Sequence, residues 1–372
     1  MYICRVPFPI LERALDIGKK RKRMLNLPNN FKLISKFITG SRLYGTNTES
    51  SDTDIRGVFI PSEEYFYGLL NHVEQIQDDE VDTEFCEIRK FLRLCIANKP
   101  NFIEYLFIPD KFILHKTIEW DNIVLNRHHI ISKKCKDSFF GYANSQLKRI
   151  KRHRGWLLHP PKKQPVRSDY GLPENKSLIP KDQIGAFNTL MASYLKQIGK
   201  HHKLAADLEE MEETVSYIST VQNLVNIDYN AVSKIMSISD NMIEALGREK
   251  AYSNSIAHWN SYQKWKKNRN SDRAKLEKKF GYDTKHASHL VRLITQGKEL
   301  LITGEIKYPR PNANFLMSIR NGSMTYDELL KFIAGFEETI DKIADDSSLP
   351  LKPNKEVIDK LCVEIVKRTL GG

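Results

Sequence analysis

The sequence lacks any apolar run close to the ~20 residues that a membrane span needs. Its N-terminus has no basic region followed by a long apolar stretch, so we expect no secretory signal. The five cysteines are scattered, odd in number and without a Cys-x-x-Cys pair. This pattern argues against a disulfide framework and against a zinc site, and it fits a reducing cytosol. Internal repeats and long low-complexity segments are also missing. We therefore expect a cytoplasmic protein with no membrane partner.

The composition is that of a soluble globular protein with room for more than one domain. The chain has 372 residues, of which 41% are hydrophobic and 28% charged, which is typical of soluble proteins. A usual domain size of roughly 100–200 residues predicts two domains. The net charge of +12 favours a polyanionic substrate or partner such as nucleic acid, although many basic proteins bind none.

One stretch of the sequence has the pattern of two strands joined by a short crossing segment. A β-branched and aromatic run, residues 31–39, ends at Gly40, and a second apolar run follows from Ile55. Asp52 and Asp54 open that second run two residues apart. Because residues i and i+2 of a strand point to the same face, the two carboxylates are expected to converge.

This arrangement predicts a site for a metal ion and a phosphate. Two carboxylates held close together repel each other unless a cation lies between them, and hard oxygen ligands suit Mg²⁺. Gly40 lets the backbone approach a ligand closely. A helix that starts at Ser41 would present free N–H groups and a hydroxyl to a phosphate. A phosphate cradle beside a metal clamp is typical of phosphoryl or nucleotidyl transfer.

The same residues resemble a known family. Gly-Ser, ten intervening residues and Asp-x-Asp form the signature of the DNA polymerase β-like nucleotidyltransferases. The fuller text from Gly40 to Pro61 is similar to a bacterial and phage branch of predicted nucleotidyltransferases labelled YcgL-like. The likeness skips the middle of the chain and recurs at residues 87–107, 282–293 and 304–322.

The resemblance implies an α+β fold with a small mixed sheet covered by helices on one face. We expect this catalytic domain to span residues 1–110, with loop and a short helix at residues 62–76. From about residue 111 onward the helical period dominates. Residues 111–372 are therefore predicted to form a mostly α-helical domain, with a basic insert at about 146–167 and a cleft-facing helix at about 284–297.

The third acidic ligand is expected in the acidic stretch at residues 77–87. Asp82 and Glu84 would share one face of a strand that pairs beside Asp52 and Asp54. We choose Asp82, because the family places an acid a few residues before the start of the next helix. Glu84 is the alternative. Some of these acids can instead be helix N-terminal charges, above all Glu87.

Two segments of the chain supply the predicted nucleotide-binding residues. In the helix that Asp283 or Thr284 would cap, the spacing i, i+4 and i+7 puts three polar side chains on one face. The resemblance implies that this helix lies over the cleft near the nucleotide phosphates. A purely structural alternative is that its histidines pack in the helix interface. The predicted nucleotide-binding residues are Gly40, Ser41, Arg42, Lys285, His286, His289 and Arg292.

Residues 146–167 contain many basic side chains and no acidic one. A basic helix that runs into a proline-broken loop with an aromatic side chain suits contact with phosphates and stacking on bases. The alternative is a solvated charged helix face. The predicted nucleic-acid patch consists of Lys148, Arg149, Lys151, Arg152, Arg154 and Trp156.

Together these features predict a nucleotidyltransferase that uses two Mg²⁺ (or Mn²⁺) ions. Asp52 and Asp54 would bridge both ions and Asp82 would hold one of them. The substrate would be an NTP and the favoured acceptor an RNA end. Transfer of a nucleotide such as AMP to a protein or small molecule is a second enzymatic interpretation. A third is a catalytically idle protein that binds RNA or another partner.

Overall fold

The computed structural model describes residues 27–49, 51–78, 82–178, 240–269 and 271–371. The chain forms two compact units, one made of residues 1–158 and 271–372 and the other of residues 159–270. The boundary predicted at residue 110 between a catalytic and a helical domain stays a prediction. Residues 179–239, which belong to the predicted helical domain, lie outside the described part of the chain.

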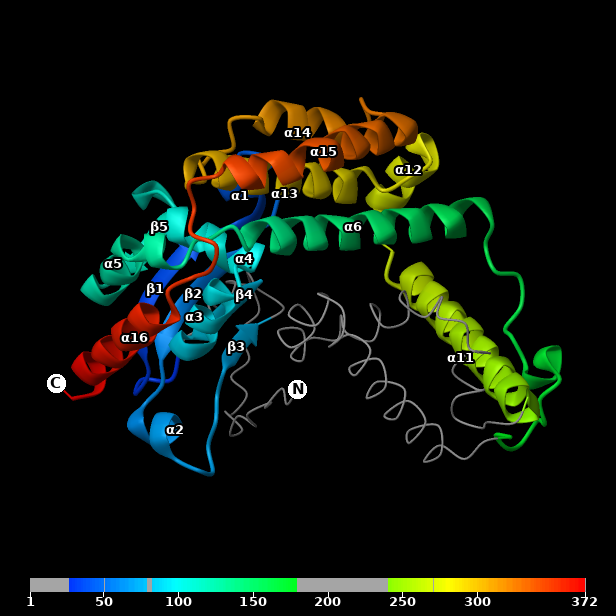
Figure 1. Ribbon diagram of the computed structural model, residues 1–372, viewed down its shortest axis with the longest axis horizontal. Coiled ribbons are helices and arrows are strands. Elements are labelled where there is room, and N and C mark those ends of the chain that lie inside the picture. The colour runs from blue at the N-terminus through cyan, green and yellow to red at the C-terminus, as the bar shows by residue number, and fades with distance from the viewer. Residues whose placement is uncertain (1–26, 50, 79–81, 179–239, 270, 372) are drawn as a thin grey trace, which may run out of the picture. The chain divides into compact units, whose positions relative to one another are not determined.

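The first unit contains a five-stranded sheet and a set of helices (Figure 1). Its strands are β1 (Lys32–Ile38), β2 (Ile55–Ile60), β3 (Gln75–Asp78), β4 (Thr83–Glu87) and β5 (Ile113–Lys116). Its N-terminal helices are α1 (Gly40–Tyr44), α2 (Glu63–Tyr67), α3 (Ile88–Ile96), α4 (Pro100–Ile103), α5 (Ile118–Leu125) and α6 (Cys135–Leu158). Its C-terminal helices are α12 (Ser271–Phe280), α13 (Thr284–Thr303), α14 (Ala313–Arg320), α15 (Tyr326–Asp346) and α16 (Lys355–Leu370). The predicted α+β fold is confirmed.

The sheet is mixed, with strand order β3-β4-β2-β1-β5. β2 and β4 run parallel, whereas the other neighbouring strands pair antiparallel. Proline at position 61 directly follows β2, as the sequence predicts, because proline cannot donate to a strand ladder. β5 was not predicted, since it lies where the helical period was expected to dominate.

Both faces of the sheet bury apolar side chains. On one face, Val58 and Cys86 join the main core with side chains of α3, α4 and α5. On the other face, Phe59 and Phe85 form a smaller cluster with Phe31. The first residue after β4 begins α3, and Glu87 caps this helix by accepting the Lys90 N–H at 3.2 Å. Glu87 is therefore a helix cap, as the structural alternative for this acid predicted.

The C-terminal helices return to the sheet domain through α13. This helix runs beside α6 (Figure 1), and a Cβ atom at Gly297 would lie 2.9 Å from Phe139 Cβ. Such a close approach of two helices requires a residue without a side chain. Asp283 caps α13 by accepting the His286 N–H at 3.0 Å, which confirms one of the two predicted caps.

The second unit contains α11 (Asp240–Lys267) and the segment that follows α6. Arg167 in this segment forms an ion pair with Glu249 of α11 at 2.6 Å. Among the described residues of both units, no helix is long and apolar enough to cross a membrane.

Candidate active site

The corner between β1 and α1 holds the carboxyl group of Asp54. Gly40 has a φ of +63°, and a Cβ atom on it would lie 1.7 Å from Asp54 Oδ2. Thr39, just before this corner, donates its backbone N–H to the Asp54 carbonyl at 2.9 Å. The Asp54 carboxyl therefore lies directly against the Gly40 backbone, in the space that the sequence analysis assigned to a ligand.

Asp54 and Asp82 form a carboxyl pair at the edge of two parallel strands. Ile55 opposes Thr83 in the β2–β4 ladder, so Asp54 opposes Asp82 one residue earlier. Burial, followed by the hydrogen bond to Asp82, raises the pKa of Asp54 to about 6. The hydrogen bond to Asp54 lowers the pKa of Asp82. The two groups therefore titrate as a pair.

Arg56 orients the Asp82 side of this pair, a role that was not predicted from the sequence. Its guanidinium donates to the Asp82 carbonyl at 2.7 Å and to Asp82 Oδ1 at 2.9 Å. Glu84 lies 3.8 Å from the same guanidinium. The two acids thus differ, because Asp82 contacts Asp54 whereas Glu84 faces Arg56. The alternation of side chains along β2 could have revealed Arg56, which lies two residues after Asp54 on the same face.

Asp52 is not brought into this pair. It lies exposed in the irregular segment before β2, and within the described part of the chain it forms no hydrogen bond or ion pair. Arg42 donates to the Ser51 carbonyl at 3.0 Å and so anchors that segment to α1. Arg42 therefore supports the loop that carries Asp52, whereas its predicted contact with a nucleotide stays a prediction.

Lys285 lies near the carboxyl pair. It is exposed in the first turn of α13, and its positive charge lowers the pKa of Asp54, opposing the larger effect of burial. The start of α13 is therefore close to the corner formed by Gly40. That α13 lies over a nucleotide-binding cleft stays a prediction.

The two histidines of α13 contact protein groups. His286 lies between Asp283, with Nδ1 at 2.6 Å from the carboxylate, and Arg149 of α6 at 3.2 Å. Burial, followed by the charge of Arg292, lowers the pKa of His289 to about 2. His289 is therefore neutral. Both rings take part in the packing of α13 on α6, as the structural alternative for these residues predicted.

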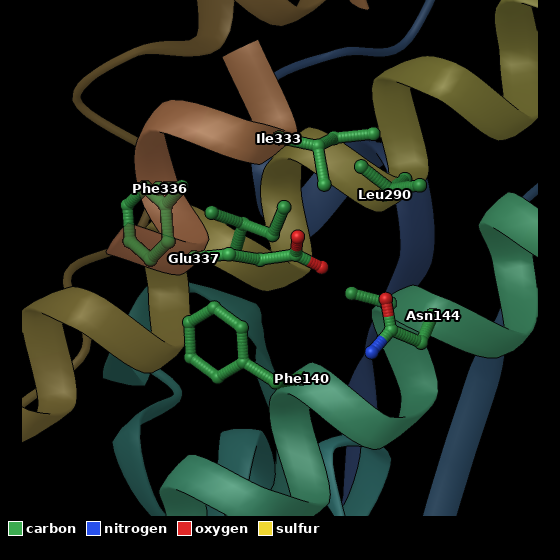
Figure 2. A pocket seen from close by; sticks show the side chains of 8 residues that line it. Phe140, Asn144, Leu290, Ile333, Phe336 and Glu337 are labelled. Atoms are coloured by element: carbon green, nitrogen blue, oxygen red, sulfur yellow. The ribbon is translucent and has the colours of Figure 1, made fainter. Parts of the chain in front are cut away.

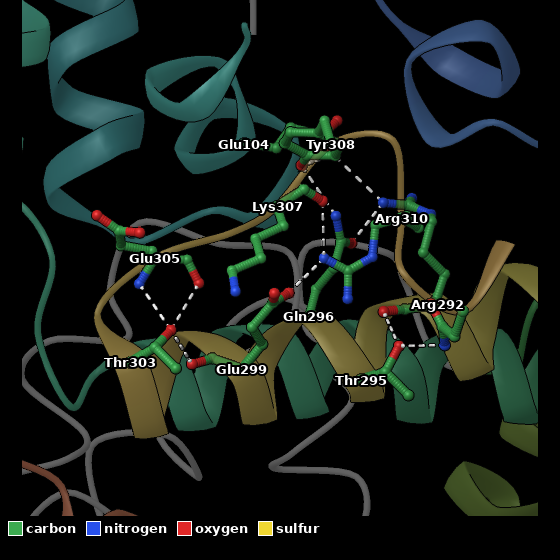
Figure 3. A network of polar contacts seen from close by, with 11 residues as sticks. Glu104, Arg292, Thr295, Gln296, Glu299, Thr303, Glu305, Lys307, Tyr308 and Arg310 are labelled. Atoms are coloured by element: carbon green, nitrogen blue, oxygen red, sulfur yellow. Dashed lines mark hydrogen bonds and ion pairs between the residues drawn. The ribbon is translucent and has the colours of Figure 1, made fainter.

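Arg292 is buried in a polar network rather than facing solvent (Figure 3). Its guanidinium donates to Glu104 at 3.2 Å and lies 3.9 Å from the centre of the Tyr44 ring. Tyr44 also donates to Glu104, at 2.9 Å, and burial raises the pKa of this carboxyl. The guanidinium is thus enclosed by protein groups. The observed role of Arg292 is to join α13 to α1 and to Glu104, and a phosphate contact in this state would require breaking that network.

The predicted nucleic-acid patch on α6 is only partly exposed. Arg154 donates to the Gly281 carbonyl at 2.8 Å. Trp156 is 4% exposed and stacks on His153 with ring centres 5.4 Å apart. Its ring is therefore not available to stack on a base, which corrects the expectation for this side chain. The exposed basic side chains of the patch are Lys148, Arg149, Lys151 and Arg152.

A small apolar cavity lies between α6, α13 and α15 (Figure 2). Its volume is about 10 Å³, which is the space that a single water molecule needs. It is too small for a nucleotide, and none of the predicted site residues lines it. Its lining residues are Phe140, Ala143, Asn144, Leu290, Ile294, Ile333, Phe336 and Glu337.

Comparisons with known proteins agree with this geometry. Residues 18–158 match a family described as "RNA repair pathway DNA polymerase beta family". The predicted resemblance to the polymerase β-like nucleotidyltransferases is thereby confirmed for this segment, which contains the Gly40 corner and both carboxyls of the pair.

Two relatives extend the comparison. An uncharacterized 38.9 kDa protein of Enterobacteria phage T4 is 20% identical over 328 residues, which cover 84% of this chain and 88% of the relative. The uncharacterized protein YcgL of Bacillus subtilis (strain 168) is 30% identical over 78 residues, or 20% of this chain and 30% of the relative. The likeness to the YcgL-like branch is therefore also found. No solved structure matches the chain.

The Gly40 corner generates a prediction about stability. Gly40→Ala should lower the free energy of unfolding by about 1–3 kcal/mol, because alanine is strained at positive φ and its Cβ would collide with Asp54. Urea unfolding measures the change. Gly141→Ala, at an exposed helical glycine with nothing within 4 Å of its added Cβ, is the matched control and should stabilise the protein slightly. Equal effects of the two substitutions would contradict the close contact.

The carboxyl pair predicts a pH dependence of stability. The folded-state pKa of Asp54, about 6, exceeds its unfolded value of about 3.9. Its contribution to stability is therefore fully present below the unfolded pKa and is lost as the pH rises through about 6. Asp54→Asn should remove this loss in protein prepared without divalent ions, as measured by urea unfolding from pH 4 to 7. The exposed-site variant Asp359→Asn should keep the wild-type slope, and the same slope in all three proteins would contradict the assignment.

Proposed function

We propose that this protein is a metal-dependent nucleotidyltransferase that transfers a nucleoside monophosphate from an NTP to a hydroxyl of RNA. One observation carries the proposal: the Asp54 carboxyl is held against Gly40, in contact with Asp82 and near Lys285. The similarity of residues 18–158 to a polymerase β family of an RNA repair pathway supports it.

The residues at this corner fit a divalent metal ion. Burial raises the pKa of Asp54, and contact with Asp82 raises it further. A cation beside both carboxyls would offset the cost of keeping them charged together. Asp54 and Asp82 would hold it, and Asp52 would join them from the exposed segment before β2. When bound, Mg²⁺ would supply charge stabilisation for the transferred phosphoryl group.

The neighbouring groups of the chain fit a triphosphate. The Ser41 hydroxyl forms no hydrogen bond within the described residues, so it can donate to a phosphate oxygen. Gly40 lets the Asp54 carboxyl lie against the backbone beside this hydroxyl. Lys285 adds a positive charge beside the carboxyls, which would offset charge on the pyrophosphate leaving group. In the reaction, the acceptor hydroxyl oxygen bonds to the α-phosphorus, the bond from that phosphorus to the pyrophosphate breaks, and the hydroxyl proton passes to solvent.

An RNA acceptor is favoured by the basic residues of α6. Lys148, Lys151 and Arg152 are exposed, and exposed cations on one helix segment suit contact with a phosphate backbone. The net charge of +12 supports the same partner. Because Trp156 is buried, we propose that this surface contacts phosphates and does not stack on bases.

The catalytic role is tested by label transfer. The protein is incubated with each labelled NTP, Mg²⁺ and total RNA, protein extract or small hydroxyl compounds. Asp54→Asn and Asp82→Asn should each reduce transfer at least about 100-fold, whereas Asp359→Asn, at an exposed site, should keep wild-type activity. RNA binding by Asp54→Asn should remain.

The outcomes separate the three interpretations. Label on RNA supports the proposal, whereas label on protein or a small molecule favours nucleotidylation of that acceptor instead. Absence of transfer to every acceptor, together with RNA binding that survives both substitutions, would favour a non-catalytic binding protein. Full activity in Asp54→Asn would refute the site.

The acceptor surface is tested by charge reversal. A triple variant with Lys148→Glu, Lys151→Glu and Arg152→Glu should weaken RNA binding at least about tenfold and reduce the slope of log K against log salt by about 2–3. Fluorescence anisotropy at several salt concentrations measures both. Arg149 is left unchanged because it contacts His286.

The matched control makes the same change of charge elsewhere. Three exposed lysines of α15 and α16 are replaced together by glutamate, and this variant should bind RNA with nearly wild-type affinity. They are Lys331, Lys342 and Lys360. Equal losses in both triple variants would show that net charge alone determines binding and would contradict a specific surface on α6.

A further inference from the structure

A second group of ionisable side chains lies apart from the Asp54 pair, within the first unit. His153 of α6, Glu277 of α12 and Asp283 at the start of α13 each place one ligand atom so that all three atoms lie within 4.8 Å of one another. The two carboxylates are each only 1% exposed. None of the three residues was predicted to bind a ligand, since they are distant in sequence and form no motif.

The chemistry of this group suits a metal ion. Two buried carboxylates close together gain from a positive charge between them, which a divalent ion would add. A neutral imidazole is a common third ligand of such an ion.

A hydrogen-bond chain fixes the orientation of Asp283. A guanidinium only donates, so Nε2 of His286 accepts from Arg149 at 3.2 Å and its Nδ1–H donates to Asp283 Oδ2 at 2.6 Å. The same carboxylate accepts the His286 backbone N–H through Oδ1. Support of a carboxylate ligand by such outer hydrogen bonds is usual at metal centres.

We propose that His153, Glu277 and Asp283 bind one zinc ion. Three atoms within 4.8 Å of one another surround a point at most about 2.8 Å from each, so small side-chain rotations reach zinc bond lengths of about 2.0–2.2 Å. One imidazole and two carboxylates suit a borderline transition metal, and water would fill the remaining position. The scattered cysteines argued against a zinc site, but this ligand set uses none of them.

The position of this group suggests a structural role. His153 lies near the end of α6, where the chain leaves the first unit, and Glu277 lies in α12, shortly after the chain returns. A bound ion would tie these two segments to the cap of α13. Closing so long a loop stabilises the folded state by restricting the unfolded chain. This inference does not depend on the proposed transferase activity.

Metal content tests the proposal. After treatment with EDTA, the full-length protein is dialysed against zinc chloride and zinc per chain is measured by mass spectrometry. Wild-type protein should hold about one zinc, and His153→Gln and Glu277→Gln should each hold less than about a tenth as much. His159→Gln, at an exposed histidine on the same stretch of chain, and Asp54→Asn should retain the ion. Zinc should raise the Tm only of the proteins that retain it.

Three outcomes would overturn the proposal: wild-type protein without stoichiometric zinc, zinc retained by both ligand variants, or zinc lost from Asp54→Asn alone. X-ray absorption on zinc-loaded wild-type protein gives an answer even where a ligand variant does not fold. Nitrogen and oxygen ligands with a single imidazole would support the assignment, whereas sulfur ligands or several imidazoles would refute it.

Discussion

The candidate active site depends on the contact between the Asp54 carboxyl and a residue without a Cβ atom. Gly40 lies in the corner between β1 and α1 at a positive φ, and Asp54 Oδ2 occupies the space that a side chain would fill. The parallel pairing of β2 with β4 then brings Asp82 to the same place. Sheet register and a glycine corner thus hold two carboxyls in contact, and burial together with this contact raises the pKa of Asp54. Strongly shifted pKa values of this kind cluster at functional sites.

The buried ion pair between Arg292 and Glu104 places α13 relative to that corner. An ion pair enclosed by protein is costly unless further hydrogen bonds satisfy both partners. Here Glu104 also accepts from Tyr44 of α1 and Tyr308, and Arg292 also donates to Gln296. The network therefore connects α1 to α13 through hydrogen bonds that satisfy both partners of the ion pair. Lys285 lies in the first turn of the same helix, and its charge acts on Asp54.

Much of the local structure could be predicted from the sequence. Residues a few positions apart were enough to predict the Gly40 corner, the end of β2 at Pro61 and the cap of α13 at Asp283. β5 could not be predicted in this way. It is a short strand at the edge of the sheet, and pairing with β1 stabilises it more than the propensity of its own residues.

The sequence by itself determined which side chains could carry the chemistry: two acids spaced as on a strand, a glycine-serine turn and a basic helix segment. Only the tertiary structure decided which of them meet. It placed Asp82 rather than Glu84 against Asp54, enclosed Arg292 and Trp156, and gathered His153 with two distant acids. The physical reason is that turns, caps and periodicity depend on neighbours along the chain. Burial, ion pairing and shifts of pKa depend instead on residues that only the packed sheet and helices bring together.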